Sequence, residues 1–454
     1  MKIIVIGVGE VGFHVASRLS HENKDVVVID TDADAIRRVS DNLDVQVLQG
    51  SGSNPRVLRE AGIEEAEILL AVTSSDEINL VACLVSNLMS PSTKKLARIR
   101  EADFDPYHEA FSSQAPRIDT IINPEIELVK TIDRLMSVPG AVDVGEFEEG
   151  RVKLIGIKLG PDTPFANVRL SELPKKIGKQ TPLIAAILRD ERLIIPRGDD
   201  CLMAGDTVYF VSEEQKLSQT LEAFGNRFDP IRRVMIIGGG RIGLRLAKLL
   251  EEKSIQTKLI EKNAERCSEL AEQLNKTVVL HGDGTDQAIL SEEGIQEMDV
   301  VVTLADDEQT NVLASLLARR LGARKAITRI NSFRYFPIMS AIGIEQVVSP
   351  RLSAINSILH HIRRGKVLSS ITIKGEQAEV IEAVALETSD IVGKPLKKVA
   401  FPREVLVTII IRDDHVIIPS GESVIVPGDR VIIFGTRQAI PKLEKILAVK
   451  LEYF

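Results

Sequence analysis

The chain has 454 residues, which at roughly 150 residues per domain corresponds to about three domains, within a range of two to four. Tryptophan is absent and aromatic residues make up 4%, so the cores are expected to be mainly aliphatic. The formal net charge of −8 argues against nucleic-acid binding, which needs a concentrated basic face.

Residues 1–137 alternate short apolar runs with longer stretches of helical periodicity. Near-continuous apolar strands separated by helices predict a parallel, doubly wound sheet with helices on both faces. We therefore expect a Rossmann-like nucleotide-binding domain. Its predicted strands are Lys2–Ile6, Val26–Ile29, Val45–Leu48, Ile68–Val72 and Lys95–Ile99.

A glycine-rich turn, Gly7-x-Gly9-x-x-Gly12, directly follows the first predicted strand and opens the first helix. Gly7 permits the tight turn, Gly9 lets a pyrophosphate approach the backbone, and Gly12 lets the helix pack closely on the strand. The helix N-terminus adds free N–H donors and partial positive charge. The turn predicts a nucleotide site. A Rossmann-like turn that binds nothing is the alternative.

Asp30 ends the second predicted strand, 18 residues beyond Gly12. A carboxylate at this point can accept hydrogen bonds from the hydroxyl pair of a ribose. Asp32 follows closely and no arginine lies beside the two acids, so a 2′-phosphate would meet negative charge. This favours NAD over NADP, with another adenine nucleotide as the alternative.

Two further strand ends are expected at the same crevice, where ligands bind in such sheets. Thr73 and Ser74 follow the fourth predicted strand, and their hydroxyl and N–H groups are placed to reach a phosphate or ribose. Arg98 lies on the fifth strand and is a candidate phosphate partner. A surface ion pair is an equally good interpretation of Arg98.

Residues 142–225 have the pattern of a small α+β module: strand, short helix, strand, hairpin, strand and helix. The module contains no phosphate loop, metal cluster or nucleophile setting, so it suits pairing or ligand sensing better than chemistry. Its predicted strands are Lys153–Lys158, Leu183–Leu188, Leu193–Ile195 and Thr207–Val211.

Residues 232–365 repeat the first domain with an offset of 231 residues. The run Gly238-Gly239-Gly240-Arg241-Ile242-Gly243 matches the first glycine turn, Glu261 replaces Asp30, and Arg329 matches Arg98. Leu304-Ala305 are less polar than Thr73-Ser74, and Lys262 weakens discrimination against a 2′-phosphate. We expect a second nucleotide site, with decay into a scaffold as the alternative.

Each of the two larger domains ends in a similar helix. Asn123 and Ser349 are good N-caps, and Pro124 and Pro350 occupy the first helical position. Each helix carries an apolar face, which either packs on its own core or serves as a swapped or dimerising surface. The residues of the two faces are Ile126, Val129, Ile132 and Met136, and Leu352, Ile355, Leu359 and Ile362.

Residues 369–454 repeat the small module, so the chain has the order A-B-A-B. The hairpin at 189–196 returns at 412–419, and Ala204-Gly205-Asp206 returns as Pro427-Gly428-Asp429. The predicted strands are Val405–Ile411, Val416–Ile418 and Val431–Phe434. A duplicated architecture follows, in which each Rossmann-like sheet precedes a small α+β domain.

Groups for catalysis or metal binding are not evident in the sequence. The seven histidines are scattered, and the three cysteines are isolated, which predicts no metal site and no disulfide framework. No apolar run has the length of a spanning helix, and the first residues do not form a signal peptide. We expect a cytosolic sensor and no catalytic residues. An NAD-dependent oxidoreductase is the alternative.

The whole chain resembles the TrkA family, the cytosolic nucleotide-binding subunit of Trk potassium uptake systems. That family has two regulator-of-potassium-conductance repeats, each with a Rossmann part and a small C-terminal part. The resemblance is carried by both glycine turns with Asp30 and Glu261, by Gly282-Asp283-Gly284 in the place of Gly50-Ser51-Gly52, and by the paired hairpins.

The resemblance implies binding of NAD(H), and in some members ATP or ADP. It implies a first crevice built by Gly7, Val8, Gly9, Glu10, Val11, Asp30, Thr73, Ser74 and Arg98. It implies a second crevice built by Gly238, Gly239, Gly240, Arg241, Ile242, Glu261 and Arg329. It further implies a homotetrameric gating ring at the inner face of the membrane, beneath an integral-membrane subunit that carries potassium.

Overall fold

The structure is a computed structural model, and its internal contacts divide the chain into two units. Met1–Lys130 and Val348–Arg363 form the first unit, and Thr131–Val347 and Arg364–Phe454 form the second. The domain boundaries expected from the sequence stay predictions, and their ends at 365 and 454 lie outside the described residues. The structure describes residues 1–113, 117–161, 163–178, 181–190, 192–225, 230–332, 335–362, 367–373 and 377–447.

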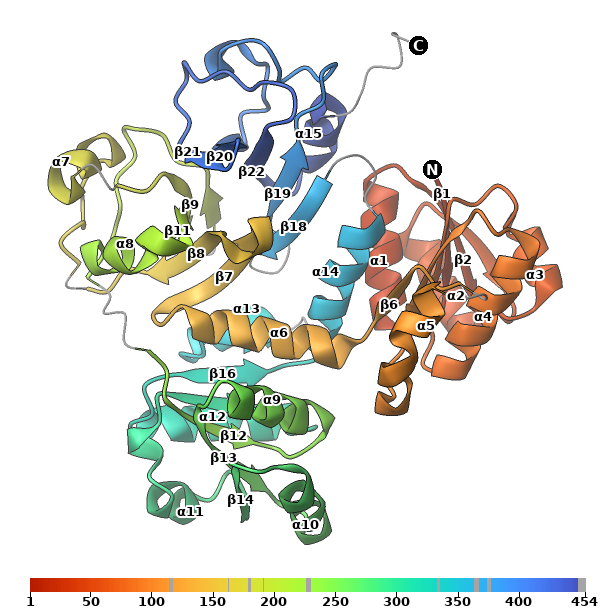
Figure 1. The fold of residues 1–454 in the computed structure, drawn as a ribbon, viewed down its shortest axis with the longest axis horizontal. Helices are drawn as coiled ribbons and strands as arrows, with labels where there is room; N and C mark the ends of the chain where they lie inside the picture. Colours follow the sequence, from red (N-terminus) through yellow and green to blue (C-terminus); the bar gives the residue numbers. More distant parts are fainter. Residues whose placement is uncertain are drawn as a thin grey trace. The chain divides into compact units, whose positions relative to one another are not determined.

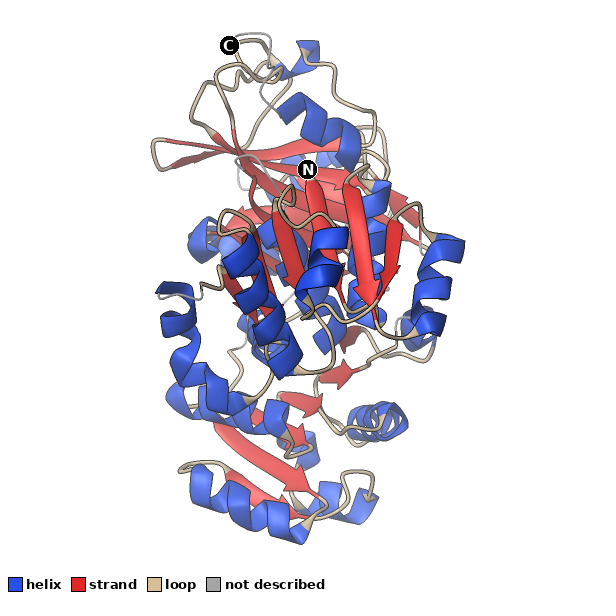
Figure 2. Cartoon of the chain, turned by 90° about the vertical axis from the view of Figure 1, so that its right-hand side faces the viewer, coloured by secondary structure: helices blue, strands red, loops and turns tan. Residues whose placement is uncertain are grey.

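The first unit is built on a six-stranded parallel sheet in the order β3-β2-β1-β4-β5-β6 (Figure 2). Its central strands are fully buried because helices cover both faces, which explains their unbroken aliphatic sequence. The strands are β1 (Lys2–Ile6), β2 (Asp25–Asp30), β3 (Gln46–Gln49), β4 (Ile68–Ala71), β5 (Lys94–Arg98) and β6 (Thr120–Ile122). The helices are α1 (Glu10–His21), α2 (Ala33–Asn42), α3 (Pro55–Glu60), α4 (Asp76–Met89), α5 (His108–Ser113), the start of α6 (Pro124–Ser137) and α14 (Pro350–Ile362).

A helix from the second half of the chain completes the first unit. α14 follows the second large sheet in sequence, yet it packs against α1 and β6 of the first (Figure 1). The Nζ of Lys94 donates a 2.8 Å hydrogen bond to the carbonyl of His361 at the C-terminal end of α14. Of the two interpretations left open by the apolar face, the swapped helix is therefore the one observed.

The second unit contains a sheet that repeats the first topology, in the order β14-β13-β12-β15-β16-β17. Residues 131–137 of α6 belong to this unit, where Asp133 pairs with Lys253, the residue that caps the C-terminal end of α9. The strands are β12 (Arg233–Ile237), β13 (Gln256–Glu261), β14 (Val278–His281), β15 (Val300–Thr303), β16 (Ala326–Arg329) and β17 (Gln346–Val348). The helices are α9 (Arg241–Glu252), α10 (Ala264–Gln273), α11 (Gln287–Glu292), α12 (Glu308–Arg320) and α13 (Phe336–Ala341).

Two small antiparallel modules complete the second unit, in the orders β10-β9-β11-β8-β7 and β18-β19-β22-β20-β21. The first has one strand more than expected, because β7 precedes the predicted ones. Its elements are β7 (Ala141–Phe147), β8 (Val152–Lys158), α7 (Leu173–Ile177), β9 (Ile184–Arg189), β10 (Arg192–Ile194), β11 (Thr207–Glu213) and α8 (Leu217–Ala223). Those of the second are β18 (Val367–Ile373), β19 (Ala378–Val384), β20 (Val405–Arg412), β21 (His415–Ile417), β22 (Arg430–Thr436) and α15 (Ile440–Leu447).

The two small modules share one hydrophobic core. Phe147 and Tyr209 of the first module cluster with Val380 and Phe434 of the second, and all four are buried. Arg430 on β22 pairs at 2.6 Å with Glu148 of the first module. This packing agrees with the pairing role expected for the modules. The predicted fold class, a duplicated Rossmann-like sheet with small α+β domains, is confirmed.

Among the described residues, no helix combines the length and the apolar character needed to cross a bilayer.

Candidate functional site

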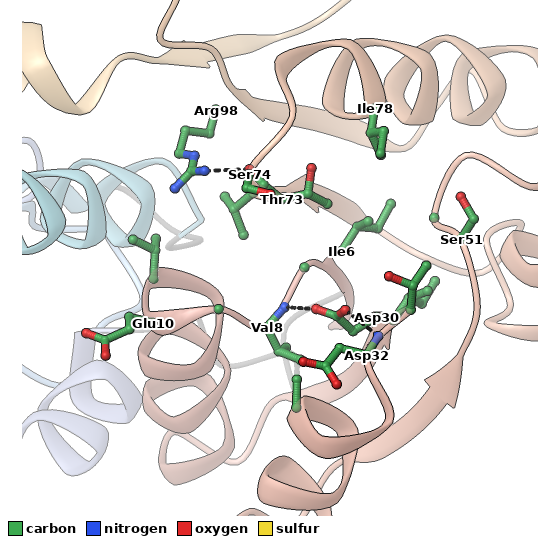
Figure 3. A pocket seen from close by; sticks show the side chains of 18 of the residues that line it. Ile6, Val8, Glu10, Asp30, Asp32, Ser51, Thr73, Ser74, Ile78 and Arg98 are labelled. Carbon is green, nitrogen blue, oxygen red and sulfur yellow. Dashed lines mark hydrogen bonds between the residues drawn. The ribbon is translucent and has the colours of Figure 1, made fainter.

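A pocket of about 680 Å³ opens at the carboxyl ends of β1, β2, β4 and β5 in the first unit (Figure 3). Such crevices are where ligands bind in open α/β sheets. Gly12 is the one predicted residue of this site that lies outside the pocket lining, inside the first turn of α1. The predicted residues that line it are Gly7, Val8, Gly9, Glu10, Val11, Asp30, Thr73, Ser74 and Arg98.

The glycine turn has the geometry expected for its three glycines. Gly7 has a φ of +90°, and a Cβ there would lie 2.7 Å from the backbone of Thr73. A Cβ on Gly12 would lie 1.9 Å from the carbonyl oxygen of Gly7, so only glycine lets α1 begin this close to β1. Gly9 differs, because no described atom lies within 4 Å of a Cβ built there. The backbone at Gly9 is thus open on its pocket side.

Asp30 is held in place by the turn that it faces. One carboxylate oxygen accepts a 2.7 Å hydrogen bond from the N–H of Val8, and the other accepts one of 2.9 Å from the N–H of Asp32 (Figure 3). Each oxygen keeps a lone pair for a further donor. The carboxylate is therefore pre-oriented at the β2 end of the pocket, where a ribose hydroxyl is expected.

A buried asparagine that the sequence analysis missed shapes the turn after β4. The Asn79 side chain is 0% exposed; it accepts hydrogen bonds from the N–H and the hydroxyl of Thr73 at 2.9 and 2.8 Å. It also donates to the carbonyl of Arg98 at 2.8 Å. Asn79 thus joins the ends of β4 and β5. Its repetition as Asn311 in the second half was the available signal.

Arg98 lines the pocket, which favours a ligand contact over a surface ion pair, although its role as a phosphate partner stays a prediction. Its guanidinium donates a 2.5 Å hydrogen bond to the carbonyl of Thr73, and its buried Nε has no hydrogen-bond partner among the described residues. Burial, reinforced by the neighbouring Arg100, lowers the pKa of Arg98 to about 10, so the side chain stays charged at neutral pH. A half-buried cation with an unused donor suits an anionic ligand.

Arg351 also lines this pocket, although it comes from the first turn of α14. Its guanidinium pairs with the carboxylate of Glu10 on the first turn of α1. The sequence analysis placed α14 with either of two partners, so it did not assign Arg351 to a site. The pocket is completed by a residue more than 250 positions beyond Arg98 in the chain.

The second crevice repeats the arrangement at β12 and β13. Gly238 has a φ of +108°, a Cβ on Gly243 would lie 2.1 Å from the carbonyl oxygen of Gly238, and no described atom lies within 4 Å of a Cβ on Gly240. Glu261 accepts a 2.7 Å hydrogen bond from the N–H of Gly239, the counterpart of the bond from Val8 to Asp30. The extra methylene of Glu261 therefore leaves the carboxylate in the same contact. Arg241 and Ile242 open α9 directly after the turn.

The strand ends of the second crevice differ from the first. Asn311 accepts a 2.8 Å hydrogen bond from the N–H of Ala305, as Asn79 does from Thr73. The counterpart of Thr73-Ser74 is thus Ala305-Asp306, and the alignment of Leu304-Ala305 with that pair was wrong by one residue. Asp306 pairs with Arg329 at 3.3 Å, so this arginine already has a carboxylate partner.

The third strand of the second sheet brings another ion pair to this crevice. Lys262 pairs with Asp283 at 2.8 Å, and Asp283 also accepts from the hydroxyl of Thr285 at 2.7 Å. These hydrogen bonds lower the pKa of Asp283 to about 2. The positive charge of Lys262 is therefore engaged, although the lysine remains largely exposed. The same loop in the first half has Ser51, whose hydroxyl bonds to that of Ser53.

The fold and the two crevices define a class of tandem proteins, in which two Rossmann-like domains are each followed by a small antiparallel module. The TrkA-N domain model matches residues 3–124 and 234–350, and the TrkA-C domain model matches residues 154–225 and 380–448. The chain belongs to the TrkA family.

Relatives match over nearly the whole length. The chain is 38% identical over 452 residues to Trk system potassium uptake protein TrkA homolog 1 of Methanosarcina mazei, covering 98% of this chain and 99% of the relative. It is 37% identical over 458 residues to Trk system potassium uptake protein TrkA of Halomonas elongata, covering 100% of both. Similarity therefore extends through both repeats.

Solved structures show the same fold at lower identity. The crystal structure of the GsuK RCK domain aligns with a TM-score of 0.59 and 18% identity, over 98% of this chain and 94% of that chain. The GsuK channel bound to NAD aligns with a TM-score of 0.59 and 19% identity, over 98% and 78% respectively.

Proposed function

We propose that this protein is the cytoplasmic regulatory subunit of a Trk potassium uptake system, and that it binds an adenine nucleotide, NAD(H) or ATP/ADP, without transforming it. Family membership supports the role in potassium uptake. The observation that carries nucleotide binding is the pocket at the carboxyl ends of β1, β2, β4 and β5.

The residues of that pocket fit such a ligand. The open backbone at Gly9 gives a pyrophosphate room beside the N-terminus of α1. Asp30 presents a pre-oriented acceptor for a ribose, and the half-buried Arg98 brings a positive charge to the pocket lining for an anionic group. These three features lie in the order ribose, pyrophosphate and distal group that the strand order imposes. Sequence and geometry thus support the same ligand class.

The second crevice supports a second site of different affinity. It keeps the open position at Gly240 and the oriented carboxylate of Glu261. Arg329, however, is paired with Asp306, so a ligand there would have to compete for it. We propose that both crevices bind nucleotides. We further propose that the second crevice discriminates less strongly between nucleotides that differ in the group beyond the pyrophosphate.

Regulation requires that the ligand favour one arrangement of the protein. A tenfold preference supplies about 1.4 kcal/mol per site, so several sites acting together make a usable switch. We propose that a homotetrameric ring sums these contributions. The ring would act on an integral-membrane, potassium-translocating subunit from the cytoplasmic face of the membrane. A solved structure of similar fold, the GsuK channel bound to NAD, agrees with such coupling.

Isothermal titration calorimetry tests the nucleotide assignment. NADH, NAD, ATP and ADP are each titrated into the wild type, Asp30→Asn and Glu261→Gln, which keep side-chain shape and remove the charge. Each substitution is expected to weaken one class of site by about tenfold or more, since hydrogen bonds to charged groups contribute roughly 1.5–3 kcal/mol. Unchanged affinity and stoichiometry in both variants would show that the ribose assignment is wrong.

The oxidoreductase alternative makes a different prediction. Within the part of the chain that the structure describes, the lining of the first pocket includes Asp30 and Arg98. It includes no histidine, lysine, cysteine or tyrosine to exchange a proton with a carbonyl substrate. We expect NADH mixed with the protein and aliphatic or aromatic aldehydes and ketones to keep its absorbance at 340 nm. Steady turnover would favour the enzyme and contradict our proposal.

A further inference from the structure

We propose that Arg351 is a specificity-determining residue of the first site: together with Arg98 it selects an adenine nucleotide with a third phosphate, which displaces Glu10 from Arg351. This inference rests on the proposed nucleotide site and adds the class of ligand and the residue that selects it. It is carried by the distribution of charge along the pocket.

The pocket is acidic at one end and basic at the other. The β2 side carries Asp30, Asp32 and Asp34 against one cation, Arg38, whereas Arg98 lies at the end of β5 and Arg351 enters from α14. Three strand spacings separate β2 from β5, or about 14 Å at the usual separation of neighbouring strands. Figure 3 shows Arg98 and Glu10 on one side of Val8 and Asp30 and Asp32 on the other.

This polarity distinguishes the candidate ligands. With the ribose at Asp30 and the first phosphates at the glycine turn, the next group along the sheet reaches the arginine end. In NAD⁺ that group is a positively charged nicotinamide, and in NADH it is neutral. ADP ends at the second phosphate, whereas in ATP the next group is the γ-phosphate, whose charge and acceptor oxygens match two guanidinium groups. A third phosphate therefore complements Arg98 and Arg351 best.

The ion pair between Arg351 and Glu10 is easily replaced. The side chains of Arg351 and Glu10 are 39% and 49% exposed, and exposed ion pairs contribute little to stability. A phosphate carries more charge and more acceptors than the carboxylate, so it competes well for the guanidinium. The exchange would bind the ligand to α14 directly. Nucleotide in the first crevice would then be held by both halves of the chain.

The second half carries the opposite charges at the same two positions. Arg241 stands where the first half has Glu10, and Glu125 stands where the second half has Arg351. α14 therefore offers a cation to the first crevice, and the matching position at the start of α6 carries an acid. This reversal predicts that selection for a third phosphate through a swapped helix is confined to the first site.

The experiment measures a ratio of affinities in the full-length chain. The parent chain carries Gly240→Ala, which leaves the first site as the intact one. We titrate it calorimetrically, in EDTA, with AMP, ADP, ATP and NADH. The same titrations are made with the parent chain that also carries Arg351→Gln or Glu10→Gln. Arg59→Gln, an exposed arginine on α3 outside the pocket lining, matches the change in net charge. Thermal unfolding without ligand reports whether each variant is folded.

We expect Arg351→Gln to weaken ATP by about tenfold or more relative to AMP, and Arg59→Gln to leave that ratio unchanged. Glu10→Gln should strengthen ATP binding, because it removes the competitor. Loss of ATP affinity in both Glu10→Gln and Arg351→Gln would mean that the ion pair only anchors α14, and would overturn the inference. So would an unchanged ratio in Arg351→Gln. If the parent chain binds no nucleotide at all, the proposed function itself fails.

Discussion

Substituting the open glycine of each crevice separates ligand binding from folding. Gly9 and Gly240 have φ values of −57° and −64°, which alanine adopts readily, and no described atom lies within 4 Å of the added Cβ. Alanine lowers the entropy of the unfolded chain, worth about 0.4–1 kcal/mol, but is a poorer N-cap by a similar amount. The free energy of unfolding of Gly9→Ala should therefore lie within about 1 kcal/mol of wild type.

The effect on binding should be much larger. The new methyl group stands where a pyrophosphate approaches the backbone, so the ligand loses hydrogen bonds to N–H groups of the turn. Loss of one charged hydrogen bond, roughly 1.5–3 kcal/mol, corresponds to at least about tenfold in dissociation constant. Gly9→Ala and Gly240→Ala should each remove one site from the titration and leave the other.

Gly12→Ala is the matched control for folding. Its Cβ would lie 1.9 Å from the carbonyl oxygen of Gly7, and backbone must shift to relieve the contact. We expect a loss of about 1–3 kcal/mol in urea unfolding, as for other overpacked positions. The reasoning is refuted if Gly9→Ala is folded and still binds nucleotide with wild-type affinity and stoichiometry.

Three further predictions concern buried groups. Lys325→Met should raise the free energy of unfolding at pH 7 by about 3 kcal/mol at most, because burial lowers the pKa of Lys325 to about 8 and penalises its charged form in the folded state. The gain should vanish above about pH 10.5, where the amine is neutral in both states; a gain constant with pH would contradict this. Burial raises the pKa of Cys83 to about 12, so iodoacetamide at pH 8 should label Cys83 in guanidinium but not in the native protein, as read by mass spectrometry. Asp206→Asn should cost about 3 kcal/mol in urea unfolding, because Asp206 is 1% exposed and accepts two 2.8 Å hydrogen bonds from Arg189; wild-type stability would show that the pair is dispensable.

The sequence predicted the parallel strands well because buried strands leave a clear record. The bounds of β1, Lys2–Ile6, were predicted without error. Both faces of this strand are covered, so every residue after Lys2 at its start is apolar. β6 was missed because it has three residues, too few for a periodic pattern. β7 was missed because Gly145 and two acidic residues interrupt its apolar positions.

The candidate site was predictable where function depends on backbone geometry. Gly7 and Gly12 sit in contacts that exclude any Cβ, so their spacing, directly after a predicted strand and at the start of a helix, implied the turn. Arg351 was not predictable in the same way. Its membership in the first pocket depends on which domain α14 packs against, and an apolar helix face fits either. Asn79 escaped notice because a single amide in a helix carries no local pattern, and only its repetition as Asn311 marked it.

The exchanged helix explains how the two crevices came to differ. In a single half-chain, α1 would lack the helix that packs on it in this chain, unless a second copy supplied the equivalent of α14. Gene duplication with fusion places both copies in one chain. The helix of one copy then packs on the other through a covalent connection, and no longer through a concentration-dependent encounter of two chains. Fusion also ends the symmetry that identical copies enforce. Selection was then free to give Glu10 and Arg241 opposite charges, which a homodimer of one gene product cannot do.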